Sequence, residues 1–208
     1  MKNIITIVLL LLCNVLSFAQ NNKKKNFETK SMFEVQVDSK KYKLEEGDEL
    51  DIEGELKNPK ISVKLLDFKK FNAGNLLFEY PSNFSFEIEK SEGYKNWTLD
   101  GNNYVIMIFD IDGESQVKDF IDNMIGQFGK EKCKTKEIKS RLGEKVLSGI
   151  QLYVELAGQK LTVDFYEYST SKNNSKYIAF QETLMDDGAT TAEGVMTFKM
   201  INDSIHYK

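Results

Sequence analysis

The stretch FEYPSNFSFE at residues 78–87 places a Tyr-Pro-Ser-Asn turn between two Phe-rich runs. Residues 76–80 are typical of a strand, and the proline of the turn ends it because proline lacks the N–H that a central ladder needs. After the turn, Phe84, Phe86 and Ile88 alternate with polar residues. The stretch therefore predicts two strands of a sheet whose apolar face packs on a layer of helices.

Further strands and two helices are predicted towards the C-terminus. Residues 105–109 are apolar at five successive positions, which is typical of a strand buried on both faces. Apolar residues at helical spacing predict a helix over residues 114–128, and Gly129 stands at its stop position. Thr190 and Glu193 have capping-box spacing and predict the start of a second helix. The expected apolar stripe of that helix is Ala192, Val195, Met196 and Met200. Three strands are expected between the helices, around residues 152–156, 161–165 and 177–180.

Residues 31–71 form a β-rich segment by the same alternation of apolar and polar residues. One of its expected strands contains Leu50 and Ile52, and another runs through residues 61–65. An Asn-Ala-Gly-Asn loop at residues 72–75 marks the boundary with the rest of the chain. The segment is either a sub-domain or an extension of the main sheet.

The order of strands, helix, strands and helix predicts an α+β fold. We expect a mostly antiparallel sheet with two main helices packed on it, preceded by the small β-rich segment. The chain has 208 residues, which favours one domain with a small appendage.

The first 19 residues predict a signal peptide rather than a part of the fold. Lys2 precedes an apolar run over residues 4–12, and Ser17 and Ala19 supply the small residues of a cleavage site. The run is shorter than the roughly 20 apolar residues of a membrane-spanning helix. We therefore expect cleavage near Ala19, a flexible leader over residues 20–30, no membrane span, and export to the periplasm or outside the cell.

Residues 74–208 resemble the fold shared by PsbP and the bacterial DcrB-like lipoproteins. The resemblance lies in the Phe-Glu-Tyr-Pro run at residues 78–81 followed by Phe84 and Phe86, a long helix after the next strands, and a terminal helix that ends at Ser204 and Ile205. It implies an α/β/α sandwich of binding or accessory character. No functional residue of the family matches across, because its metal-related sites draw on histidines and this chain has one, His206.

Most catalytic arrangements lack their residues in this sequence. His206 is the third residue from the C-terminal end, which argues against a catalytic histidine in a core and against a zinc site built with one. Cys133, in a lysine-rich run, is either a reactive thiol with a lowered pKa or a half-buried strand residue. The net charge of −4 argues against a nucleic-acid surface. We predict no catalytic residue, no metal and no cofactor.

Carboxylates remain as candidate chemistry. Seven of the eleven residues 45–55 are acidic, and they are read as a solvated strand face. Two alternatives stay open: a carboxylate-dependent hydrolase with a cleft between the β-rich segment and the sandwich, and a calcium-stabilised surface protein.

The leading hypothesis is an exported, non-catalytic binding or accessory protein. Its partner would be a protein or a small molecule of the cell envelope. Aromatic residues dominate binding hot spots. Trp97, Tyr94 and Tyr104 cluster around the Asp-Gly turn at residues 100–101 and are the candidate ligand-binding residues.

Overall fold

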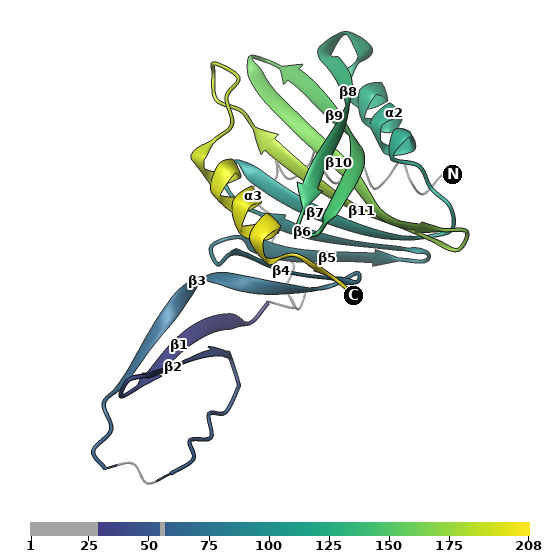
Figure 1. Ribbon diagram of the computed structural model, residues 1–208. Coiled ribbons are helices and arrows are strands. Elements are labelled where there is room, and N and C mark those ends of the chain that lie inside the picture. The colour runs from purple at the N-terminus through teal and green to yellow at the C-terminus, as the bar shows by residue number, and fades with distance from the viewer. Residues whose placement is uncertain (1–28, 55–56) are drawn as a thin grey trace.

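Two antiparallel sheets form the frame of the protein in the computed structural model, which describes residues 29–54 and 57–208 (Figure 1). The signal peptide and most of the leader predicted above lie outside these residues. The first sheet, sheet A, has five strands in the spatial order β12 (His206–Tyr207), β4 (Leu76–Pro81), β3 (Ile61–Ala73), β1 (Ser31–Val37) and β2 (Lys40–Glu45). The second, sheet B, has seven in the order β5 (Ser85–Ser91), β6 (Tyr94–Asp100), β7 (Tyr104–Asp112), β11 (Asn174–Thr183), β10 (Gln159–Ser171), β9 (Lys145–Leu156) and β8 (Cys133–Leu142).

The predicted fold class, an α+β sandwich with two main helices covering one sheet, is wrong. Of the described residues, 57% lie in strands and 16% in helices, and the strands form two sheets. Sheet A, rather than a layer of helices, packs on much of one face of sheet B, and the apolar residues of the two sheets share one core. That core joins Phe71 and Phe78 of sheet A to Ile106 and Ile108 of sheet B and to Ile201 near the C-terminus.

The β-rich segment, residues 31–71, is continuous with the rest of the protein. The loop at residues 72–75 is the turn between β3 and β4, which pair from Phe68 with Pro81 to Ala73 with Leu76. The long strand β3 pairs with β1 at its first half and with β4 at its second half. Strands β1, β2 and the start of β3 therefore project from the body as an arm (Figure 1).

Two predictions for the arm are wrong: the strand at Leu50 and Ile52, and the strand face formed by the acidic residues. The predicted strand at Leu50 and Ile52 is wrong, because no strand occurs among the described residues between Glu45 and Ile61. Gly47, with φ of +91°, turns the chain after β2, so the acidic residues that follow lie in a loop.

The first helix, α2 (Val117–Phe128), confirms the predicted helix from Val117 onward. Gln116 is its N-cap, and its backbone N–H donates to Asp119 Oδ2 at 3.4 Å. The helix ends at Gly129, whose φ of +95° suits glycine. The predicted apolar stripe is buried against sheet B, where it forms a second core with Phe109 and neighbouring residues. A short 3₁₀ turn, η1 (Lys130–Lys132), follows.

The last helix, α3 (Ala192–Ser204), exists where it was predicted but buries another face. Gly194, Thr197 and Ile201 are buried, whereas Val195 and Met196 of the predicted stripe are exposed. The N-cap is Thr191 rather than Thr190, and its hydroxyl accepts a hydrogen bond from Gly194 N at 3.0 Å. Gly194 lies against the Glu182 side chain of β11: a Cβ there would be 2.2 Å from Glu182 Oε1, so the glycine makes this contact possible.

Candidate functional site

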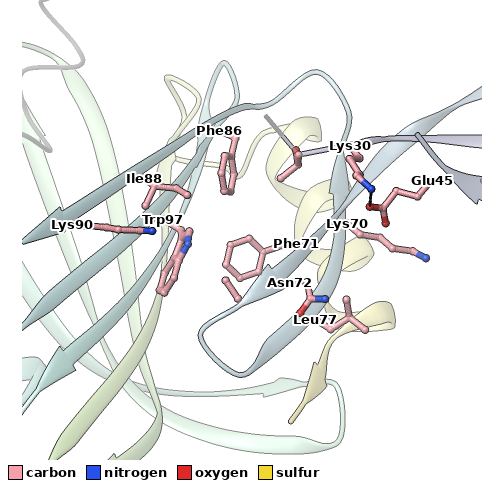
Figure 2. Close-up of a pocket in the computed structure, with 12 residues that line it drawn as sticks. Lys30, Glu45, Lys70, Phe71, Asn72, Leu77, Phe86, Ile88, Lys90 and Trp97 are labelled. Atoms are coloured by element: carbon pink, nitrogen blue, oxygen red, sulfur yellow. Dashed lines mark ion pairs between the residues drawn. The ribbon is translucent and has the colours of Figure 1, made fainter. Parts of the chain in front are cut away.

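A cavity of about 350 Å³ lies where the two sheets meet, at the base of the arm (Figure 2). On one side is the second half of β3, beyond its pairing with β1. On the other side are the edge strand β5 and its neighbour β6. Thr29, which precedes β1, also lines the cavity and shares a hydrogen bond with the Tyr80 hydroxyl of β4. Ligand pockets are typically about 300 to 1,000 Å³, so the cavity can take a small molecule.

Aromatic and aliphatic side chains form the wall of the cavity. Phe71 comes from β3, Phe86 and Ile88 from β5, and Trp97 from β6. The ring of Phe71 meets Trp97 edge-on, with centroids 6.1 Å apart, and lies 6.5 Å from Phe86. The Phe71 ring also stacks on the Phe78 ring, with centroids 4.8 Å apart. This packing holds the Phe71 ring in place between Trp97 and Phe86. Trp97 is the single tryptophan of the chain.

The turn between β3 and β4 places β3 against Trp97. Gly74 and Asn75 have φ of +59° and +67°, a pair typical of a tight hairpin turn. A Cβ at Gly74 would lie 3.4 Å from the Trp97 ring and 3.1 Å from Tyr168 Oη. The Tyr168 hydroxyl donates to Gly74 O at 2.7 Å. Glycine therefore suits both the turn and this close approach.

Lysines surround the apolar wall. Lys30 forms an ion pair with Glu45 at 3.4 Å, and both residues line the cavity on the side of the arm. Lys70 and Lys90 also line the cavity and form no ion pair with a described residue. Figure 2 shows the Lys90 side chain pointing toward Trp97, whereas Lys70 points away from Phe71. Among the described residues, the site thus combines an apolar interior with the unpaired ammonium group of Lys90 at its side.

The three residues predicted to bind a ligand do not form one surface. Trp97 lines the cavity, but Tyr94 is buried on the opposite face of β6, in the core beneath α2. Tyr104 is buried elsewhere in the first core and stacks on Phe180 with centroids 6.1 Å apart. Burial raises the pKa of both tyrosines well above the ordinary value, with nearby Glu89 adding to the effect at Tyr94 and Glu182 at Tyr104. The sequence analysis did not predict the wall residues Phe71, Phe86 and Ile88 as ligand-binding residues.

Carboxylates do not gather in the cavity. The acidic residues at 45–53 are mostly exposed, and no group of three metal-ligating side chains occurs in the described part of the chain. Asp164 of β10 is partly buried, and burial raises its pKa although Gln151 and the Tyr166 hydroxyl donate hydrogen bonds to it. Asp164 lines neither the cavity nor a second hollow of about 680 Å³ between α2, β8 and β9.

Cys133 is half-buried at the start of β8. Burial and the neighbouring Glu131 raise the pKa of its thiol, against the smaller lowering effect of Lys132. The reactive-thiol alternative required a lowered pKa, so the structure favours the half-buried strand residue.

An apolar stripe on β3 is exposed rather than buried. Ile61, Val63 and Leu65 alternate as predicted, but their exposed fractions are 62%, 63% and 59%. They lie opposite Val37, Val35 and Phe33 of β1, so the arm carries one apolar face. No helix in the described part of the chain is long and apolar enough to cross a membrane.

No protein-family model and no curated protein matches this chain. Among solved structures, a protein from Bacteroides thetaiotaomicron is similar with a TM-score of 0.42 and 15% identity, over 69% of this chain and 49% of that chain. LpqN of Mycobacterium tuberculosis, described as involved in cell envelope biogenesis, is similar with a TM-score of 0.34 and 11% identity, over 62% of this chain and 81% of that chain. The chain thus spans about half the length of the Bacteroides protein. Both likenesses are too distant to carry an argument, and the resemblance to PsbP stays a prediction.

Proposed function

We propose that the protein is an exported, non-catalytic binding protein, and that its ligand occupies the cavity between the sheets. The observation that carries the proposal is the wall of Phe71, Phe86, Ile88 and Trp97 around about 350 Å³. Small-molecule sites are typically concave and mostly apolar, with few polar groups that fix orientation. Here Lys90 and the Lys30–Glu45 pair supply those polar groups.

The arrangement favours binding over catalysis. A carboxylate-dependent hydrolase needs acidic groups facing the bound substrate, and Glu45, the acid among the described residues that line the cavity, is engaged by Lys30. Asp164, whose raised pKa would suit a catalytic acid, lies away from the cavity. Export is supported by residues 1–19, and a mature N-terminus at Gln20, read by mass spectrometry of exported protein, is its test.

Binding in the cavity is tested with two matched variants. Ile88→Gln places an amide in the apolar wall, and Ile150→Gln makes the same change at a half-buried isoleucine that lines the second hollow. Small apolar molecules are titrated by calorimetry into the wild type and into both variants. We expect Ile88→Gln to weaken binding about tenfold, since losing the burial of half an isoleucine costs about 1 to 1.5 kcal/mol. Ile150→Gln should leave the affinity unchanged. An equal loss in both variants, or no binding by the wild type, would contradict the proposal.

A further inference from the structure

The charges near the cavity are unbalanced in a chain that is acidic as a whole. The net charge is −4, yet three lysines and one acid occur among the described residues that line the cavity. Lys30 is neutralised by Glu45. Lys70 and Lys90 keep their charges unpaired among described residues, and of these two Lys90 points toward the apolar wall.

The sequence of β5 aims Lys90 at the same space as the wall. Side chains two residues apart on a strand share a face, so Phe86, Ile88 and Lys90 follow one another along one side of β5. The ammonium group thus lies at the end of a row of apolar side chains, beside Trp97 of the neighbouring strand.

A second lysine lies directly across from Lys90. In the register of β5 with β6, Lys90 pairs with Lys95, and opposed residues of an antiparallel pair lie on the same face. Like charges in this position repel and destabilise a sheet. On the other side of Lys95, Asp110 of β7 is held by Lys176 at 3.5 Å and by Asn174 at 2.6 Å. The Lys90–Lys95 pair is therefore suited to an external anion that would relieve this repulsion.

We propose that the ligand is an anionic amphiphile, with its apolar part on the wall of Phe71, Phe86, Ile88 and Trp97 and its acidic group at Lys90. This inference rests on the proposed function, since it assigns a ligand class to the same cavity. A water molecule takes about 30 Å³ in the liquid, so about 350 Å³ holds an apolar part of roughly a dozen non-hydrogen atoms. A carboxylate on a medium-length alkyl chain has this size and this charge.

Three probes that share a ten-carbon chain test the ligand class: decanoate, decan-1-ol and decyltrimethylammonium. Each is titrated below its micelle concentration, and binding is followed by calorimetry and by the emission of Trp97, the single tryptophan. We expect decanoate to bind at least tenfold more tightly than the other two. Lys90→Met should lower decanoate affinity about tenfold and leave that of decan-1-ol unchanged. Lys118→Met, at an exposed lysine of α2, is the control and should change neither affinity.

The outcomes separate this inference from the proposed function. Equal affinities for the three probes, or a decanoate affinity that Lys90→Met leaves intact, would overturn the anionic ligand while the binding cavity stands. The absence of binding both to the three probes and to vesicles of phosphatidylglycerol would overturn both. Vesicles of phosphatidylglycerol distinguish two sources of the same chemistry. Lys90-dependent sedimentation with vesicles, without binding of free decanoate, assigns the ligand to a membrane lipid; Lys90-dependent binding of decanoate assigns it to a free amphiphile.

Discussion

Removing the Phe120 side chain should strongly destabilise the protein. Phe120 is 6% exposed and lies at the centre of the contact between α2 and sheet B. Its ring centroid is 5.4 Å from that of Phe109, 5.7 Å from Phe165 and 5.5 Å from Tyr177. Deleting a buried phenylalanine side chain costs about 3 to 5 kcal/mol, and each aromatic pair adds about 0.5 to 1.5 kcal/mol beyond buried area. For Phe120→Ala we expect a loss in the upper part of that range, about 4 to 5 kcal/mol.

The assay is unfolding in urea, followed by far-UV circular dichroism. The loss is read from the shift of the midpoint, with the slope of the transition unchanged. Gln127→Ala, at an exposed position of the same helix, is the control and should change stability by less than about 0.5 kcal/mol. A loss below about 1 kcal/mol for Phe120→Ala would refute the packing of α2 on sheet B.

Three further predictions concern Asp164, two glycines and the effect of calcium. Burial raises the pKa of Asp164, so the folded protein keeps a proton that the unfolded chain has lost between the two pKa values. Stability therefore rises as the pH falls through that window. Asp164→Asn, which can still accept the hydrogen bond from Gln151, should raise the melting temperature at about pH 7 and flatten this pH dependence. Gly149→Ala should cost more than about 3 kcal/mol, because its Cβ would lie 2.0 Å from a backbone carbonyl oxygen of β10, whereas Gly126→Ala, in open space on α2, should stabilise by about 0.5 to 1 kcal/mol. Calcium at about 1 mM should leave the melting temperature unchanged, because the acids at 45–53 form no three-ligand group with other described residues; a rise of many degrees would contradict this.

Local patterns in the sequence predicted many elements but not which faces they bury. The alternation of Ile61, Val63 and Leu65 marks a strand correctly, yet alternation cannot show whether another layer covers the apolar side. In α3, a glycine and a threonine are buried in preference to Val195 and Met196. The buried face of α3 packs mainly on β4, and the N-terminus of the helix contacts Glu182 of β11. The orientation of the helix therefore depends on contacts with distant parts of the chain.

The fold class was wrong for a related reason. The pattern of residues 31–81 predicts a series of short strands. It does not show that these strands form a separate sheet, sheet A, whose apolar residues share a core with sheet B. Strand β8 was also missed apart from Cys133 at its start, because its edge position leaves most of its residues exposed and weakens the apolar alternation.

The candidate site was predictable in one residue. Trp97 was predicted because it is the single tryptophan and lies near a turn, and it lines the cavity. Its partners Phe71 and Phe86 look like ordinary core residues, and Lys90 like an ordinary surface charge. The register and order of strands β3, β5 and β6 place these residues around one cavity. The sequence alone does not indicate this arrangement.

The most direct test of the binding cavity is ¹⁹F NMR of protein labelled with 5-fluorotryptophan. The chain has one tryptophan, so the spectrum of the folded protein reports on Trp97 alone. We predict that decanoate shifts this resonance saturably, with the affinity that calorimetry gives, and that Ile88→Gln weakens the response. Binding seen by calorimetry with an unchanged Trp97 resonance would place the ligand elsewhere and contradict the account.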